Sequence, residues 1–144
     1  MDLPYYLNLG IEKELENIKL GKLSRTRSQL TDKYRSPREK DIEFMSTPED
    51  RIAYICSRLP SIFSVIKEII FNLQKIALDI KLETLLDLGS GPGTVMYAVT
   101  DILNLENITL VEKDRYLIEI GKRLAANADI DSVKKAEWIN CDIN

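Results

Sequence analysis

The sequence contains no histidine among its 144 residues and only two cysteines, Cys56 and Cys141. Without histidine, the most common general base, the Ser-His-Asp arrangement and every histidine-based zinc site are excluded from this chain. Two cysteines are too few for a disulfide framework, a four-thiolate metal site or an iron–sulfur site. We therefore predict no metal site in this chain.

Long hydrophobic runs are also missing, since no stretch approaches the roughly 18 uncharged apolar residues of a membrane span. The first four residues, 1–4, lack the basic start of a secretory signal. With 44% apolar and 30% charged residues, the composition is that of an ordinary globular protein with one domain's capacity for a core. These features predict a soluble cytoplasmic protein that makes no membrane contact.

Basic and acidic residues are nearly equal in number, 20 against 23, and the net charge is −3. This balance argues against a surface built throughout for nucleic acid. The segment from Lys19 to Lys40 differs, because it holds eight basic and only two acidic residues. Such a segment can lie near phosphates, or it can be a solvated helical face whose long side chains cover apolar surface. Both interpretations stay open at this point.

The first 81 residues show helical periodicity. Thr47 followed by Pro48 predicts a helix start, and Pro60 is expected to end that helix after Leu59, because proline lacks the amide donor and clashes with the previous turn. A second helix is predicted from Ser61. Its broad apolar face, which we expect another element to cover, comprises Ile62, Val65, Ile66, Ile69, Ile70, Leu73, Ile76, Ala77 and Ile80.

From residue 82 the pattern changes to alternating strands and helices. Buried strands are predicted over 84–88, 108–114 and 136–142, with helices over 95–105 and 115–128 between them. This alternation is typical of a parallel sheet with helices packed on it. The sequence thus predicts an α/β protein with a helical amino-terminal region, 1–81, and a three-stranded Rossmann-like domain, 82–144.

The run DLGSGPG at residues 87–93 lies where the first predicted strand meets the following helix. Glycines there permit a positive φ and a close approach of the backbone to a ligand, although they can also serve only a tight turn. A dinucleotide-binding loop would need a third glycine where this chain has Thr94. Further acids, Glu112 and Asp142, lie at the ends of the second and third predicted strands, and Glu112 comes at the spacing from which a carboxylate can accept from ribose hydroxyls. The less favoured alternative for Glu112 is a solvated acid near Lys113, whereas any acid near a strand end would look like Asp142.

The acid two residues before the first glycine resembles the first motif of class I S-adenosylmethionine-dependent methyltransferases. The resemblance implies S-adenosylmethionine as cofactor, with the acid at Asp87 contacting its amino-acid part, Glu112 its ribose and Asp142 its adenine amino group. It implies these cofactor-binding residues: Asp87, Gly89, Ser90, Gly91, Gly93, Thr94, Glu112 and Asp142.

Residues 53–70, together with the segments 85–94, 110–114 and 138–142, are similar to a narrower group, the methyltransferase-like proteins associated with the small ribosomal subunit in bacteria and mitochondria. This resemblance implies ribosomal RNA or a small-subunit assembly intermediate as the partner, with the Lys19 to Lys40 segment near phosphates.

The chain departs from that family in lacking the cysteines that hold a metal or cluster, so no metal site is transferred to it. A complete fold of this class has seven strands and only three are predicted here, so we expect the amino-terminal portion of such a protein and assign no catalytic residue. The function predicted is that of a methyltransferase, or part of one, acting on ribosomal RNA or in small-subunit assembly. Alternatives are a non-catalytic assembly factor that keeps the cofactor fold and a methyltransferase for a small molecule.

Overall fold

The computed structural model describes residues 2–16 and 45–144 of the chain. Its elements are, in order, α1 (Tyr5–Glu16), α3 (Pro48–Ile76), β1 (Thr84–Leu88), α4 (Thr94–Thr100), β2 (Asn107–Glu112), α5 (Arg115–Ala126), α6 (Asp131–Lys134) and β3 (Glu137–Asn140). The basic segment from Lys19 to Lys40 lies outside the described residues.

The three strands form one parallel sheet in the order β1-β2-β3, with helices in each crossover. The register sets Asp87 beside Leu110 and Glu112 beside Asn140. Since parallel strands end at the same edge, the carboxyl ends of all three strands meet there. The predicted α/β class, a three-stranded parallel sheet preceded by a helical segment, is confirmed, and it is consistent with part of a Rossmann-like fold.

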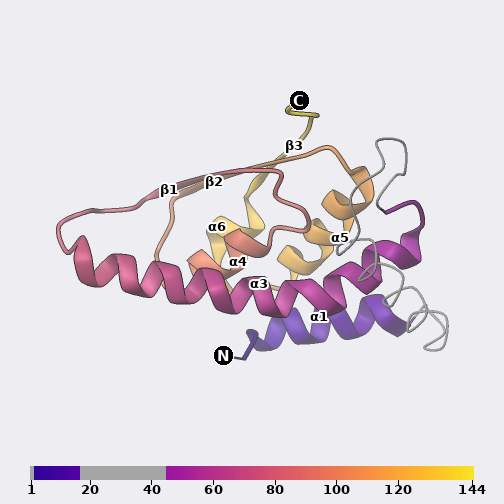
Figure 1. Cartoon of the computed structure of the whole chain (residues 1–144), viewed down its shortest axis with the longest axis horizontal. Coiled ribbons are helices and arrows are strands. Elements are labelled where there is room, and N and C mark those ends of the chain that lie inside the picture. The colour runs from indigo at the N-terminus through magenta and orange to yellow at the C-terminus, as the bar shows by residue number, and fades with distance from the viewer. Residues whose placement is uncertain (1, 17–44) are drawn as a thin grey trace, which may run out of the picture.

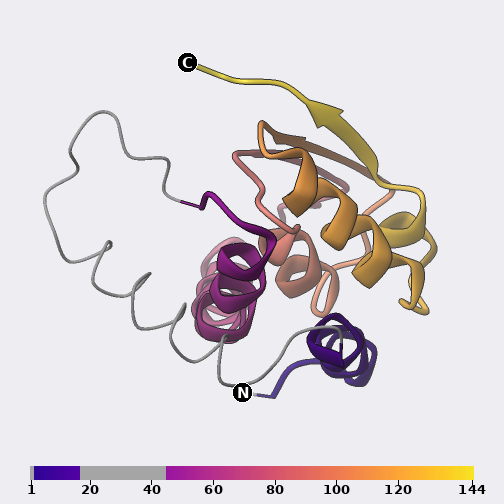
Figure 2. The ribbon, with the colours of Figure 1, turned by 90° about the vertical axis from the view of Figure 1, so that its right-hand side faces the viewer.

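The helices lie on one side of the sheet. Figures 1 and 2 show α4, α5 and α6 beneath the strands, with α1 and α3 beneath them in turn. On the opposite face, Leu86 and Leu88 of β1 are 63% and 56% exposed and Ile139 of β3 is 39% exposed. The part of the chain that the structure describes therefore leaves an apolar sheet face in contact with solvent.

The amino-terminal helices share one core with the sheet and its crossover helices. Leu7 of α1, Leu59 and Phe63 of α3, and Met96 and Tyr97 of α4 are all fully buried in it. Burying such a side chain contributes about 1.5–3 kcal/mol. Helices α1 and α3 thus stabilise the fold that carries the glycine-rich loop.

The start of α3 forms as the sequence predicts. Thr47 is the N-cap, its Oγ1 accepts from Asp50 N at 3.1 Å, and Asp50 Oδ2 accepts in return from Thr47 N at 3.0 Å. This reciprocal pair satisfies two amides that an uncapped helix leaves without partners. The pKa of Asp50 is lowered: burial acts to raise it, but the hydrogen bonds from Thr47 and Ser46 outweigh burial.

The predicted break at Pro60 is wrong, because α3 continues through it from Pro48 to Ile76. Leu59 and Phe63, one on each side of the proline, are both fully buried, so core packing holds the two halves in one helix. Serine hydroxyls also bond to carbonyls around the proline, Ser57 to Ala53 O at 2.7 Å and Ser64 to Pro60 O at 3.0 Å. Such bonds from a serine hydroxyl to the carbonyl four residues earlier occur within continuous helices.

The predicted covering of the broad apolar face after Ser61 is also wrong for most of its length. Ile66 and Ile70 pack against the core, but Val65, Ile69 and Ile76 are 56%, 54% and 84% exposed. The reason is geometric: α3 runs along most of the length of the molecule and extends past the short helix α4 that it contacts (Figure 1). Periodicity shows which residues prefer burial and says nothing of how long the partner helix is.

Smaller differences concern element ends. Helix α4 stops at Thr100 instead of residue 105, β3 covers only Glu137–Asn140, and the short helix α6 had no signal in the sequence. No helix among the described residues has the length and apolar character that crossing a membrane would require.

Candidate functional site

The glycine-rich loop of residues 89–93 joins β1 to α4 at the carboxyl edge of the sheet. Gly89, Gly91 and Gly93 have φ values of +78°, +56° and +88°, which explains why the loop needs glycine at each of these positions. The loop is fixed to the neighbouring strand, because the amides of Gly89 and Ser90 both donate to Val111 O, at 2.8 and 3.0 Å. The backbone of the loop is therefore held by β2.

The glycines of the loop face two different environments. A Cβ on Gly89 or Gly91 would meet no atom of residues 2–16 or 45–144 within 4 Å, whereas one on Gly93 would lie 3.0 Å from Trp138 Cη2. Trp138 thus packs beneath the carboxyl end of the loop, while the described residues leave room for a side chain at exposed Gly89 and at buried Gly91. An open position with a positive φ is suited to a ligand lying against the backbone.

Glu112, the last residue of β2, connects the loop to the start of α5. Its Oε2 accepts from Gly91 N and its Oε1 from Asp114 N, each at 2.8 Å, and the residue is 8% exposed. Each carboxylate oxygen has two acceptor sites, so both can still accept from a ligand. Glu112 is therefore a buried and oriented carboxylate, unlike a solvated surface acid.

Asp87 and Ser90 carry polar atoms that need a partner. Asp87 Oδ2 and Ser90 Oγ are buried and bond to no group of residues 2–16 or 45–144. Burial raises the pKa of the Asp87 carboxyl, and the negative charge of nearby Glu112 raises it further. Buried polar groups nearly always have partners, so such atoms beside an open loop are candidates for ligand contact.

Two other predicted residues have different surroundings. Thr94 is the buried first residue of α4, 5% exposed. Asp142 follows β3 at the same edge of the sheet but is exposed, and its Oδ1 accepts from Asn144 N at 3.1 Å. The structure therefore brings Asp87, Glu112 and the glycine loop together, whereas Asp142 bonds to its own neighbour in the chain.

Sequence reasoning missed the role of Asn140 at the end of β3. Its Nδ2 donates to Glu112 O at 3.0 Å and to Lys113 O at 2.9 Å, so it fixes the backbone just after β2. The parallel register, which sets Asn140 beside Glu112, is the signal that could have pointed to it.

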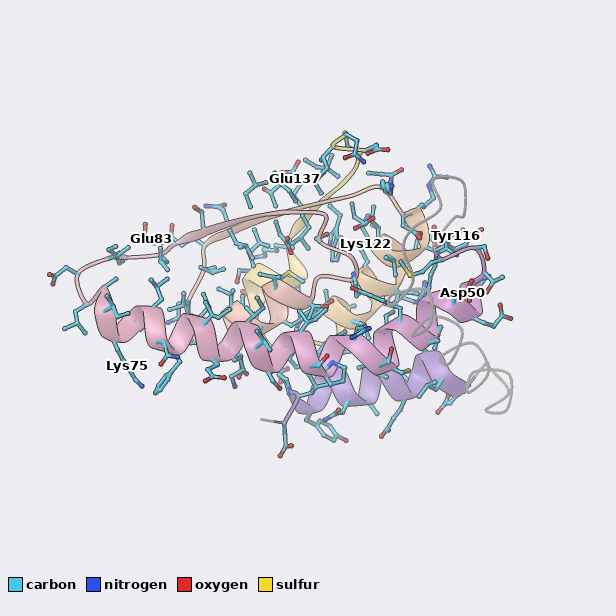
Figure 3. All side chains as sticks on the ribbon, viewed as in Figure 1. Asp50, Lys75, Glu83, Tyr116, Lys122 and Glu137 are labelled. Atoms are coloured by element: carbon cyan, nitrogen blue, oxygen red, sulfur yellow. The ribbon has the colours of Figure 1, made fainter. Side chains whose placement is uncertain are left out.

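Sequence reasoning also missed an ion pair between α3 and the N-cap of α5. Arg51 Nε lies 2.9 and 2.8 Å from the two carboxylate oxygens of Asp114, and the two side chains are only 7% and 15% exposed. The Arg51 guanidinium also lies over the ring of Tyr116, with 4.6 Å from Cζ to the ring centre. Figure 3 shows Tyr116 at the same end of the molecule as Asp50, the neighbour of Arg51.

The site thus combines the buried carboxylate of Glu112, the half-buried carboxylate of Asp87 with its buried Oδ2, and the Ser90 hydroxyl, which has no partner among the described residues. Carboxylates bind hydroxyl, ammonium or other cationic groups and disfavour anions. The described residues hold no cluster of three or more cysteine and acidic side chains arranged for a metal ion. The arrangement is therefore suited to binding an organic ligand that carries hydroxyls and positive charge.

Comparison with known proteins gives one family. No curated protein matches the chain. Residues 48–144, from the first turn of α3 to the last residue, match the family described as mitochondrial small ribosomal subunit Rsm22. The match covers the site, the sheet and the helix that carries Arg51, and it links the chain to the small ribosomal subunit. The chain belongs to the Rsm22 family of small ribosomal subunit proteins.

Proposed function

We propose that this chain binds S-adenosylmethionine at the glycine loop and acts with the small ribosomal subunit, as the cofactor-binding part of a methyltransferase directed at ribosomal RNA or its assembly. The observation that carries the proposal is the pair of carboxylates at the loop, one buried and one half-buried. Asp87 has a buried oxygen without a partner among the described residues, and Glu112 accepts a hydrogen bond from the Gly91 amide.

The Gly91 amide is the decisive group when this ligand is compared with a dinucleotide. In phosphate-binding loops, backbone amides and the helix N-terminus point at the phosphate oxygens. Here the Gly91 amide donates to Glu112 instead, and a second acid, Asp87, lies nearby. A pyrophosphate would meet two carboxylates where it needs donors, while a ligand with ribose hydroxyls and positive charge meets acceptors.

In this proposal, each residue of the site binds a different part of the ligand. Asp87 binds the charged amino-acid part, and Glu112 accepts from the ribose hydroxyls. Ser90 supplies a hydroxyl, and the open positions Gly89 and Gly91 admit the ligand to the backbone. Asp142 is assigned to the adenine amino group on the family resemblance, and its exposure leaves it accessible to that group.

When bound, S-adenosylmethionine supplies an electrophilic methyl group on a sulfonium. The chain's own residues bind and orient, because transfer of a methyl group depends mainly on holding donor and acceptor in line. Asp87 and Glu112 have this holding role, and neither is assigned proton transfer. Trp138 acts behind the loop, where it fills the space beneath Gly93.

Contact with ribosomal RNA is assigned to the basic segment from Lys19 to Lys40, which lies outside the described residues. Lysine and arginine there would neutralise phosphates without reading sequence. Replacing Arg25, Arg27, Arg35 and Arg38 by glutamine should release the protein from purified small subunits in a sedimentation assay. Loss of co-sedimentation would speak against a small-molecule methyltransferase, and unchanged co-sedimentation would contradict the contact between this segment and RNA.

Titration calorimetry of the full chain with S-adenosylhomocysteine and with NAD tests the cofactor proposal. We expect binding of the first and none of the second. Gly91→Val should reduce the affinity at least about 100-fold, because the side chain would fill the open position at a φ that costs a residue with a Cβ about 1–2 kcal/mol. Gly10→Ala, a glycine change in α1 outside the loop, is the matched control and should leave the affinity unchanged.

The outcomes separate the enzyme from its rivals. Preferential binding of NAD, or full affinity in Gly91→Val, would contradict the site. A Gly91→Val protein that loses S-adenosylhomocysteine but still supports small-subunit assembly in cells would favour a non-catalytic assembly factor that keeps the cofactor fold.

A further inference from the structure

The carboxylate of Glu112 is held by two amides, and one of these belongs to Asp114. Glu112 Oε1 accepts from Asp114 N at 2.8 Å, as Oε2 does from Gly91 N. The orientation of this carboxylate therefore depends on where the backbone of Asp114 lies. Any group that fixes Asp114 also fixes Glu112.

Asp114 is fixed from two sides. Its Oδ1 caps α5 by accepting from Tyr116 N at 2.9 Å and from Leu117 N at 3.3 Å. Both of its carboxylate oxygens also accept from Arg51 Nε, at 2.8 and 2.9 Å. The cap alone leaves the other face of the carboxylate without a partner, and Arg51 supplies that partner from a helix 63 positions away in sequence.

Arg51 is itself well anchored. It lies in the first turns of α3, next to the capping box of Thr47 and Asp50, and is 6% exposed. Its guanidinium also packs on the Tyr116 ring. A buried, charge-assisted contact of this kind is stronger and more directional than an exposed ion pair.

We propose that Arg51 is a positioning residue for the cofactor site: through Asp114, it sets the carboxylate of Glu112 that accepts from the ribose. The inference rests on the proposed function, since it assigns a role at the same site. It also gives α3, which precedes the sheet in the chain, a part in ligand binding without any contact to the ligand.

The test compares two ligands on matched variants of the full chain. Titration calorimetry measures S-adenosylhomocysteine and its 2′-deoxyribose analogue, which lacks one of the hydroxyls that Glu112 would bind. The wild-type chain should prefer the ribose form. In Arg51→Met we expect the affinity for the ribose ligand to fall about tenfold, the effect typical of removing a residue that supports a ligating side chain. Arg51→Met should also lose most of the preference for the ribose ligand over the deoxyribose ligand. Arg51→Lys should recover part of the affinity and part of the preference.

Arg123→Met is the matched control. Arg123 Nε and Nη2 bond to Glu14 at 2.7 and 3.0 Å, so this pair also joins an amino-terminal helix to α5. It lies in the last turn of α5, away from Asp114 at the first. Arg123→Met should keep both the affinity and the ribose preference.

Each outcome decides between the claims. Suppose that the wild-type chain binds S-adenosylhomocysteine with a preference for the ribose form. If Arg51→Met and Arg51→Lys both keep that affinity and preference, the role of Arg51 is overturned and the proposed function stands. An equal loss for both ligands in these variants would show a general structural effect and overturn positioning. A wild-type chain that binds no S-adenosylhomocysteine would overturn the proposed function itself. If Arg51→Met does not fold, Arg51→Lys alone carries the comparison.

Discussion

Replacing Gly121 by alanine probes the packing behind the glycine loop. Gly121 lies in α5, and a Cβ there would be 2.4 Å from Trp138 Cη2 and 2.8 Å from Pro92 O. The tryptophan ring could move by itself, but Pro92 O belongs to the backbone of the loop. Alanine at this position therefore forces the loop, the ring or α5 to shift.

The expected magnitude follows from two opposing effects. Alanine in a helix is favoured over glycine by about 1 kcal/mol. Overpacking a tight interior costs about 1–3 kcal/mol, and the backbone contact puts this site at the upper end. The free energy of unfolding should thus fall by about 1–2 kcal/mol. With a urea dependence of about 2 kcal/mol/M, the unfolding midpoint moves down by about 0.5–1 M.

The assay is direct, because Trp138 is the only tryptophan in the sequence and its fluorescence reports on this contact. Gly10→Ala in α1 is the control: its Cβ would meet Leu124 Cδ2 at 2.6 Å, and the far end of a leucine side chain can turn away. Because the neighbour is a side chain and not backbone, Gly10→Ala should lose less stability than Gly121→Ala. A Gly121→Ala protein as stable as the wild type, with unchanged tryptophan emission, would refute the packing described here.

Two further variants test the site and the sheet. Because the pKa of Asp87 is raised in the folded state, the stability this carboxyl contributes is present below its ordinary pKa of 3.8 and is lost as the pH rises through the raised value. Asp87→Asn should therefore be more stable than the wild type in thermal melts at pH 7 but not below pH 3.8, while its affinity for S-adenosylhomocysteine falls about 10- to 100-fold. If Asp87→Asn is less stable than the wild type at pH 7, the inference that the charged Asp87 carboxylate destabilises the fold is wrong. On the sheet, Leu88→Lys should change the free energy of unfolding in urea by no more than about 0.5 kcal/mol, since Leu88 is 56% exposed. Leu110→Lys on the covered face should prevent folding, since Leu110 is fully buried. A large loss in Leu88→Lys would show that this face is covered in solution.

The sheet and the loop were predictable because their signals are local. A short apolar strand running into DLGSGPG needs only neighbouring residues to specify a strand, a turn with positive φ and a helix start. The caps at Thr47 and Asp114 are local in the same way, and both formed as their sequences indicate.

Features set by distant parts of the chain could not be read from local patterns. Pro60 stays within α3 because Leu59 and Phe63 are buried in the core that α3 shares with α1 and α4. The ion pair of Arg51 with Asp114 joins residues 63 positions apart, and neither has a distinctive spacing. Whether the apolar residues after Ser61 are covered depends on the length of α4, which periodicity does not encode.

The anchoring of Gly91 to Glu112 also bears on the thermodynamics of ligand capture. Ordering a backbone residue costs about 1–2 kcal/mol, so a five-residue loop that became ordered only on binding would lose about 5–10 kcal/mol of affinity. Here residues 89–93 are already tied to β2 through Val111 O and Glu112, so that entropy is spent during folding. For the S-adenosylmethionine binding proposed above, preorganisation of this kind would lower the cost of ordering the loop when the ligand binds.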